Sequence, residues 1–381
     1  MSNITLASWN VNSLKVRLPQ LLDWLKTSGV DAVVLQETKL TDDLFPAESI
    51  REAGYDVVFT GQKTYNGVAL LSKRDVFLPP EDVLLGLPDF PDDHKRFVAA
   101  TLVTRREGKA IRFIGGYFPN GMTPGSWKYL YKLDWIAALT RHLKDTLTQC
   151  PDLVLGGDFN IAPEDADVWN PAERKDDILV SAPERAAFRE LLKLGLSDSF
   201  RLVSQESARY SWWDYRMKGF ENNHGLRIDH LLVSEALKER VKAVDIDTGP
   251  RGNLQPSDHA PATVTLELCS AAQRRAALSA CRRVSVQRAN SASAPSPSGC
   301  TSSHATPQAA RSAASYVSKG IPAASSGFLV GIPVRASESP STPFTSSTAT
   351  RTPSLPKSTS SPKGSELSGS CTNSSTFSVQ S

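Results

Sequence analysis

The chain has 381 residues, of which 40% are hydrophobic and 22% charged, and a formal net charge of +3. This length excludes a small disulfide-stapled scaffold and leaves room for an ordinary domain of about 250 residues. Every Trp and nearly every acid lies in 1–268, whereas 269–381 is rich in Ser, Ala, Thr and Pro. We therefore predict one folded domain over 1–268 and a disordered tail over 269–381.

The net charge changes sign at the same boundary. Residues 1–268 contain 32 Lys and Arg against 38 Asp and Glu, or −6, while 269–381 contain 11 against 2, or +9. An acidic domain does not exclude a nucleic-acid partner, because metal-binding carboxylates are themselves negative. Basic pairs such as Lys73-Arg74 and Lys95-Arg96 could contact phosphates or could form an ordinary solvated surface.

Cysteine usage and hydropathy bear on the compartment. Cys150 is the only cysteine before residue 269, so no disulfide framework can form in the folded part. The sequence shows no basic and apolar leader, and the longest apolar run of the tail, Gly327–Val334, is far shorter than the roughly 20 residues that span a bilayer. We expect a cytoplasmic protein, of the bacterial cytoplasm and nucleoid, without a membrane anchor.

The first half alternates between helical and strand-like patterns. Apolar runs and turn signals predict strands at Ile4–Trp9, Ala32–Leu35, Tyr55–Phe59, Val68–Leu71, Phe97–Val103 and Ile111–Tyr117. Apolar residues at three- and four-residue spacing predict a helix over Leu18–Lys26. A long helix is predicted from Ser126, a possible N-cap, to Leu147, with one apolar face formed by Trp127, Leu130, Leu133, Ile136 and Leu139.

The second half has a similar order of elements. Strands are predicted at Leu153–Leu155, Tyr210–Trp213, Ile228–Val233 and Ala260–Leu268, with a helix over Pro183–Leu194. Strand-rich blocks between helices favour two mixed β-sheets packed face to face with helices outside, because each sheet can then bury one apolar face. The predicted fold class is α/β (α+β).

Polar groups follow several of these strands. Asn10 ends the first strand, Glu37 follows the second, and Asp158 with Asn160 follows Leu153–Leu155. Carboxylate and amide oxygens suit Mg²⁺ or Mn²⁺, which often partner phosphate substrates. We therefore expect a single phosphodiester site at a sheet edge, although a carboxylate at one strand end is common in any protein.

The segment Gly156–Asn160 is a sharper signal. Two glycines allow close backbone approach, and Asp158 and Asn160, two positions apart, point to the same side of an extended chain. Such a pair can place water or a leaving oxygen against phosphorus. The alternative is an ordinary Asx-type turn after a strand.

Two Asp-His pairs occur, Asp229-His230 and Asp258-His259. A distant Asp that orients His259 would raise its basicity, and the imidazolium could stabilise charge on a phosphate. Strand alternation instead directs His230 away from Asp229 and into packing.

An aromatic segment with a cation, Tyr210–Arg216, precedes the predicted strand Ile228–Val233. Its rings could stack on sugars or bases while Arg216 holds phosphate, or the rings could simply form core.

Nine short segments, in this order, resemble the exonuclease III family of apurinic/apyrimidinic endonucleases, within the deoxyribonuclease I-like superfamily. They are Trp9–Asn12, Leu35–Lys39, Gly61–Lys63, Tyr65–Ala69, Gly116–Gly121, Gly157–Pro163, Ser211–Arg216, Gly225–His230 and Ser257–Pro261. The resemblance covers Ile4 to about Leu268 and implies a four-layer α/β sandwich with the site where loops from both sheets meet.

The resemblance also implies residue roles. Glu37 would hold Mg²⁺ (or Mn²⁺) with Asn10, and Asp258 would add to this metal or to a second one; Asp158, Asn160 and His259 complete the expected ligand candidates. Tyr117, Asn160 and His259 would contact the scissile phosphate, Asp229 would orient His259, and Asp158 would activate water or protonate the leaving 3′ oxygen. Substrate contacts are expected at Trp212, which would exclude normal nucleotides, and at Arg96, Asn120 and Arg216.

The implied activity is hydrolysis of double-stranded DNA by a monomer, 5′ to abasic sites or at nicks and 3′ ends, where nucleotides and blocking groups are removed. Val168–Ser181 departs from better-known members, which leaves the balance of these activities open. The tail, without counterpart, is either a basic DNA tether or translated sequence of no function. Hydrolysis of another phosphodiester and a non-catalytic DNA-binding scaffold are the competing interpretations, but the scaffold would require loss of a catalytic group and none is missing.

Overall fold

The computed structural model describes residues 2–268, so the tail predicted over 269–381 lies outside the described residues. Six strands form the first sheet in the order β13-β14-β1-β2-β4-β3. Strand β1 pairs in parallel with β2, and the other neighbours are antiparallel. The strands are β1 (Ser2–Asn10), β2 (Ala32–Gln36), β3 (Tyr55–Thr60), β4 (Val68–Lys73), β13 (Val241–Ile246) and β14 (Ala262–Leu268).

The second sheet also has six strands, in the order β5-β6-β7-β8-β12-β9. Its only parallel pair is β7 with β8. The strands are β5 (Glu81–Leu85), β6 (Phe97–Val103), β7 (Ala110–Tyr117), β8 (Leu153–Asp158), β9 (Leu196–Asp198) and β12 (Asp229–Ser234). A separate two-stranded sheet joins β10 (Trp212–Trp213) to β11 (Gly225–Leu226).

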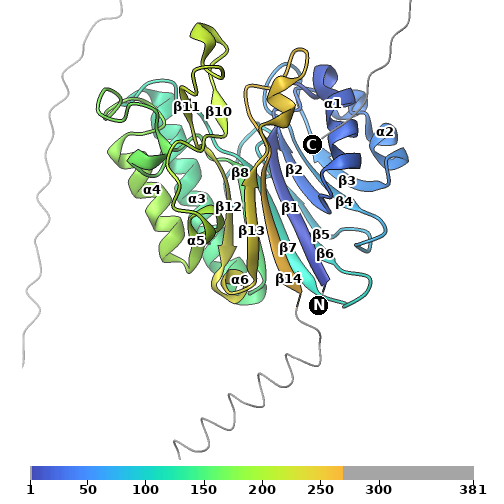
Figure 1. The fold of residues 1–381 in the computed structure, drawn as a ribbon. Helices are drawn as coiled ribbons and strands as arrows, with labels where there is room; N and C mark the ends of the chain where they lie inside the picture. Colours follow the sequence, from blue (N-terminus) through green and yellow to red (C-terminus); the bar gives the residue numbers. More distant parts are fainter. Residues whose placement is uncertain (1, 269–381) are drawn as a thin grey trace, which may run out of the picture. The chain divides into compact units, whose positions relative to one another are not determined.

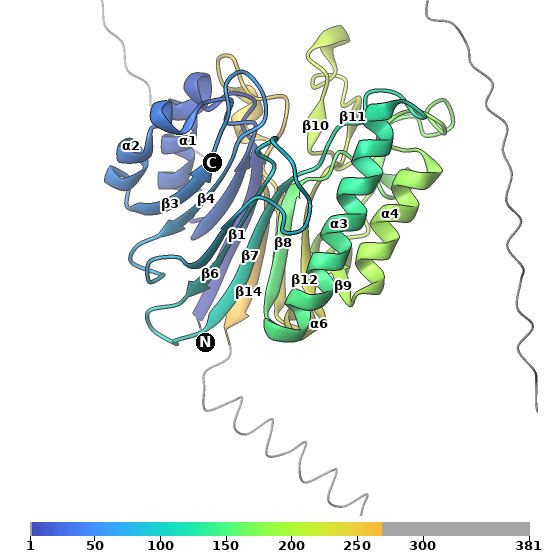
Figure 2. The same cartoon turned by 180° about the vertical axis from the view of Figure 1, so that it is seen from behind.

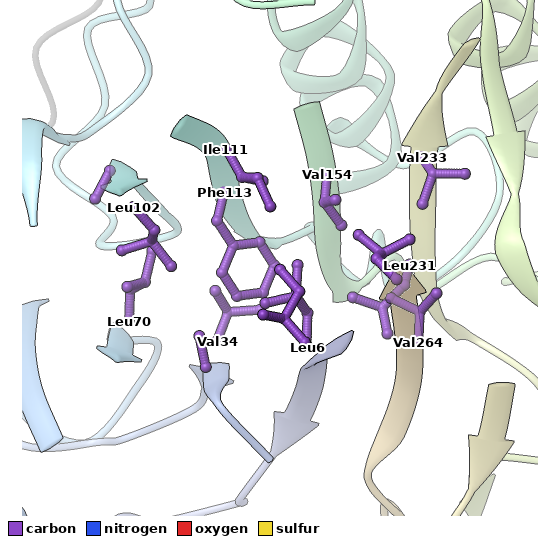
Figure 3. Packing of buried hydrophobic residues seen from close by; sticks show 14 of the residues in the cluster. Leu6, Val34, Leu70, Leu102, Ile111, Phe113, Val154, Leu231, Val233 and Val264 are labelled. Atoms are coloured by element: carbon purple, nitrogen blue, oxygen red, sulfur yellow. The ribbon is translucent and has the colours of Figure 1, made fainter. Parts of the chain in front are cut away.

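The main core lies between the two six-stranded sheets. Leu6, Val34 and Leu70 of the first sheet meet Phe113, Val154 and Leu231 of the second, and all are buried (Figure 3). The alternation of apolar residues places these side chains on the inner faces, as expected for sheets that each bury one face.

Helices cover both outer faces, which completes four layers (Figures 1 and 2). On the first sheet, α1 (Leu14–Thr27) and α2 (Ala47–Glu52) pack over Trp9 and Leu35 through residues such as Leu21 and Ile50. On the second sheet, α3 (Trp127–Gln149) and α4 (Ala182–Lys193) contribute Trp135, Leu139 and Phe188. The shorter helices are α5 (Ser199–Val203), α6 (Glu235–Lys238), η1 (Asp42–Leu44), η2 (Asp165–Asp167), η3 (Arg216–Lys218) and η4 (Gly249–Gly252). The predicted four-layer α/β sandwich is confirmed.

Strand direction brings the polar strand ends together. The parallel pairs β1–β2 and β7–β8 each carry their C-terminal residues to the same edge. Tyr117 pairs with Asp158 across β7 and β8, and Asp158 pairs with Asp229 across β8 and β12. The β10–β11 sheet lies at this same end of the sandwich (Figure 1).

Several predicted elements need correction. The first helix begins at Leu14, four residues earlier than expected, and Pro19 lies inside its early turns. Tyr210 and Ser211 precede strand β10 and are not part of it. The sequence missed β5, β9 and β13, which are short or largely exposed and lack a full apolar alternation.

The predicted apolar face of α3 is partly wrong. Ser126 caps the helix through its side chain, as expected. However, Trp127 and Leu130 are 71% and 57% exposed, and the buried positions include Tyr129, Lys132 and Trp135. Within 2–268, the structure contains no helix with the length and apolar character needed to cross a membrane.

Candidate active site

A histidine and a carboxylate from different strands meet at this sheet edge. His259, just before β14, shares a hydrogen bond of 2.8 Å between its Nδ1 and Asp229 Oδ2, and both residues are buried. The Ser211 hydroxyl accepts hydrogen bonds from the backbone N–H groups of Ile228 and Asp229, which fixes the start of β12. Burial lowers the pKa of His259, but the charges of Asp229 and Asp158 outweigh it and raise the pKa to about 10. His259 is therefore an imidazolium near neutral pH.

Asp158 faces this imidazolium from the end of β8. Its Oδ2 lies 3.8 Å from His259 Nε2 and accepts a hydrogen bond of 2.9 Å from the Asn10 amide. Burial raises its pKa to about 7 against the effect of His259, and Asp229 and Glu37 add to the rise. A carboxyl group with this pKa can either accept or release a proton near neutral pH.

Glu37 lies at the end of β2, on the other side of Asn10. The Asn10 amide donates to its Oε1 at 2.9 Å, Tyr117 donates to the same oxygen at 2.8 Å, and Lys39 pairs with Oε2 at 2.8 Å. Burial raises the pKa of Glu37, but Lys39 and Asn10 outweigh burial and lower it overall. Glu37 has a φ of 54°, a conformation that is uncommon for residues other than Gly and often found at functional sites.

Two asparagines extend the cluster. Asn160 has a φ of 50°, and its amide donates to Asp158 Oδ2 at 3.2 Å and to the Phe118 carbonyl at 3.1 Å. Its Oδ1 accepts a hydrogen bond of 3.0 Å from Asn120. The structure therefore brings Asn160 and Asn120, from the loops after β8 and β7, into direct contact.

Asp258 and Trp212 lie beside this cluster and contact each other. Trp212 Nε1 donates to Asp258 Oδ2 at 3.0 Å, and Asn12 donates to the other carboxylate oxygen at 2.8 Å. Trp212 also borders a cavity of about 500 Å³ together with Ile178 and Leu179. The indole is thus held at the edge of this cavity, and the backbone of Trp212 pairs in antiparallel fashion with that of His259.

The predicted substrate residues separate into two groups. Arg96 lies over the Tyr117 ring, 4.8 Å from its centroid, and lines a cavity of about 420 Å³ with Asn120, Glu37 and Tyr117. Lys39, Lys128, Trp127 and Tyr65 belong to the same cavity. Arg216 is different: its side chain is 84% exposed and pairs with Asp214 at 2.6 Å, and it lines neither of these cavities.

The donor groups fit a divalent cation. Four carboxylates, those of Glu37, Asp158, Asp229 and Asp258, lie in or beside this cluster with the cations Lys39 and His259. Donor atoms of Asp158, Asp229 and His259 lie within 4.8 Å of one another. Carboxylate oxygens such as those of Asp158 and Glu37 are hard donors that suit a divalent cation.

Asn10 presents its amide nitrogen to these carboxylates, while its Oδ1 accepts a hydrogen bond from the Asn12 backbone. Coordination by Asn10 would therefore require its amide to turn. The ligand roles of all six residues, Asn10, Glu37, Asp158, Asn160, Asp258 and His259, stay predictions.

Sequence reasoning missed three residues that shape the site. No role follows from the sequence pattern for Lys39, for Ser211 or for Lys132. Lys39 pairs with Glu37, Ser211 holds the backbone of Asp229, and Lys132 donates to the Asn160 carbonyl at 2.7 Å. A signal for Lys132 was available, since a lysine three residues before Trp135 lies close to the buried face of a helix.

Two packed sheets whose strand ends deliver carboxylates, amides and an imidazolium to one edge define the class of four-layer α/β phosphoester hydrolases. The sequence profile of the Endonuclease/Exonuclease/phosphatase family matches residues 7–259. The chain belongs to this family.

Its relatives confirm the resemblance to exonuclease III. Exodeoxyribonuclease III of Haemophilus influenzae is 38% identical over 263 residues, covering 67% of this chain and 96% of the relative. The structure of a 3′ phosphatase from Neisseria, bound to a product DNA hairpin, is 45% identical with a TM-score of 0.66 and covers 70% of this chain and all of that one. An AP endonuclease from Archaeoglobus fulgidus is 35% identical with a TM-score of 0.63 and the same coverages.

Proposed function

We propose that the protein is a metal-dependent DNA-repair hydrolase that cleaves DNA 5′ to abasic sites and removes nucleotides and blocking groups from 3′ ends. The observation that carries the proposal is a buried series of contacts: Asp229 binds His259, and His259 faces Asp158. The Asn10 amide joins Asp158 to Glu37. The DNA relatives described above support a DNA substrate.

The roles of the chain's residues follow from their contacts. Glu37 would hold the cation, which would supply charge neutralisation at the scissile phosphate. His259 stabilises a non-bridging phosphate oxygen as an imidazolium, and Asp229 keeps its Nδ1 protonated and its ring oriented. Hydrolysis needs one proton taken from water and one given to the leaving oxygen, and Asp158, with a pKa near 7, can serve in either transfer.

Two cavities whose walls include predicted substrate residues support a DNA substrate. The cavity of about 420 Å³ is lined by the cations Lys39, Arg96 and Lys128 and by the exposed rings of Tyr65 and Trp127. Such groups pair with phosphates and stack on bases. The other lies beside Trp212, which would contact the base-free sugar.

A 3′-end enzyme with little abasic cleavage is the second candidate. The observation in its favour is that the two Neisseria structures at 45% identity are described as a 3′ phosphatase and a 3′-5′ exonuclease. The Archaeoglobus AP endonuclease at 35% identity supports the broader activity.

One experiment separates the two functions. The full-length protein is incubated with Mg²⁺ and either a duplex that carries one internal abasic analogue or a nicked duplex with a 3′ phosphate. Cleavage of both substrates supports the first proposal, and phosphate release without incision supports the second. Glu37→Ala and EDTA should each abolish activity, whereas Glu48→Ala, an exposed residue paired with Arg51, should retain it. If neither DNA substrate is cleaved, or if activity survives in EDTA, both proposed functions are contradicted.

A further inference from the structure

Lys132, on α3, is fully buried beneath the active site. Its ammonium donates to the Asn160 carbonyl at 2.7 Å, to the Asn120 carbonyl at 3.2 Å, and to the Glu184 carboxylate. The three protons of the ammonium thus meet three acceptors. Two of these acceptors belong to the loops that carry the site's asparagines.

Glu184, on α4, connects the same ammonium to a third segment. Its Oε1 accepts the N–H of Leu179 at 3.1 Å, and its Oε2 accepts the N–H of Ser181 at 3.1 Å and the Ser181 hydroxyl. Leu179 also accepts a hydrogen bond of 2.7 Å from Ala162 through its carbonyl, and it borders the cavity beside Trp212. Lys132 and Glu184 therefore link the loops after β7 and β8 to the wall of this cavity.

Stability alone does not explain a buried ion pair at this position. Burial of two charges costs desolvation energy that their attraction often does not recover, and apolar replacements are frequently as stable. The adjoining buried positions of α3, Trp135, Ile136 and Leu139, are apolar and pack well. What an apolar residue could not do is donate hydrogen bonds to two carbonyls at once.

Asn160 needs such a restraint. Its φ of 50° lies in the sparsely populated left-handed region, and its side chain joins Asp158, the Phe118 carbonyl and Asn120. Rotation about the backbone of Asn160 would move its amide away from Asp158. A donor fixed to the Asn160 carbonyl opposes that rotation, because the carbonyl and the side chain turn together.

We propose that Lys132 and Glu184 are positioning residues, in which the Lys132 ammonium fixes the Asn120 and Asn160 loops against the scissile phosphate and Glu184 ties them to the cavity wall at Leu179. This deepens the proposed function and rests on it. Neither residue contacts substrate, so both act through Asn160, Asn120 and Leu179.

The test is a double-mutant cycle in the full-length protein, assayed on whichever of the two DNA substrates the wild type cleaves. Lys132→Met should lower kcat about 10- to 100-fold with KM within about threefold, since a displacement of about 1 Å can cost this much. In an Asn160→Ala background the same change should cost less than about threefold, because the group on which Lys132 acts is gone.

Two further variants separate positioning from folding. Lys132→Met combined with Glu184→Gln removes the unpaired buried charge, so stability should recover while kcat stays low. Leu143→Ala, on the buried face of α3, supplies a destabilised control with kcat within about twofold of wild type. The inference would be overturned if Lys132→Met lowered kcat equally in the wild-type and Asn160→Ala backgrounds. It would also be overturned if kcat recovered in the variant that combines Lys132→Met with Glu184→Gln.

A spectroscopic readout makes failure of this inference distinguishable from failure of the proposed function. In protein labelled with ¹⁵N-asparagine, Lys132→Met should shift the side-chain amide signals of Asn160 and Asn120, while Leu143→Ala should leave them in place. Unchanged signals overturn the inference whether or not DNA is cleaved. Shifted signals in a protein that cleaves neither substrate support the structural link and contradict the proposed function.

Discussion

The hydrogen bond between Asp229 and His259 has a measurable effect on catalysis. We expect Asp229→Asn to lower kcat about 100-fold or more with little change in KM, because the amide cannot stabilise the imidazolium as a carboxylate does. Steady-state cleavage of the DNA substrates measures it. Asp245→Asn, an exposed carboxylate paired with Arg209, is the control. A tenfold or smaller loss for Asp229→Asn would contradict the assigned role.

His230, the neighbour of Asp229, has a structural role. Its Nε2 donates to the Ile161 carbonyl at 2.9 Å, and its Nδ1 accepts from Arg227 at 3.0 Å, so the ring is held neutral. Burial, together with the Arg227 charge, lowers its pKa to about 4. The sequence correctly directed His230 into packing: it meets the rings of Phe159 and Phe188 at 5.1 Å.

This pKa predicts a pH dependence of folding. The unfolded chain binds a proton at His230 near pH 6.5, whereas the folded protein does so only near pH 4. The free energy of unfolding should therefore fall as the pH drops from 6.5 towards 4, and level off below that. His230 alone should account for a loss of about 3 kcal/mol. Urea unfolding at pH 7.5 and 4.5 measures the loss, which His230→Gln should largely remove. Parallel pH dependences of wild type and variant would show that His230 is not the cause.

Residue types at strand ends were sufficient to find the main site from sequence. Glu37, Asp158, Asn160 and Asp229 lie together because strands of both sheets bring their polar ends to the same end of the sandwich. The partners of Asp258 were not predictable, because its contacts with Asn12 and Trp212 depend on loop conformations. Arg216 binds Asp214 for a similar local reason.

At the level of elements, close pairing of β7 and β8 depends on Gly157. A Cβ at this position would lie 2.1 Å from the Gly116 carbonyl oxygen, so Gly157→Ala must separate the two strands. We expect a loss of at least about 3 kcal/mol in the free energy of unfolding. Denaturant titration measures it. Gly195→Ala, at a φ of 91° with no atom within 4 Å, should cost only about 1 kcal/mol, and equal losses would contradict this explanation.

Element boundaries were predictable where local signals were strong. The strand Phe97–Val103 is confirmed residue for residue, and Ser126 caps α3 as expected. The buried face of α3 was predicted correctly at Ile136 and Leu139 but wrongly at Trp127 and Leu130, which are apolar yet exposed. Lys132 is polar yet buried in the ion pair with Glu184. In these places tertiary contacts override the apolar pattern.

The whole molecule joins chain segments that are distant in sequence. Strand β14, which ends at Leu268, pairs with β1 from Ser2↔Leu268 to Ser8↔Ala262, so the two ends of the domain close the first sheet together. His259 and Asp258 immediately precede this closing strand. The alternation of strands and helices could predict two packed sheets, but strand order could not follow from it, because pairings between distant strands leave no local pattern.

This closure predicts that 1–268 is sufficient for folding and activity. Every residue assigned to the site lies between Asn10 and His259, and the last strand of the first sheet ends at Leu268. A protein that ends after Leu268 should keep kcat within about twofold and show the same unfolding midpoint as the full chain. Because 269–381 carries a charge of +9, a DNA tether would instead appear as a higher KM on truncation that becomes smaller as salt is raised. Cleavage measured at two salt concentrations decides between them: an unchanged KM supports a dispensable tail, and a salt-dependent rise assigns it to DNA binding.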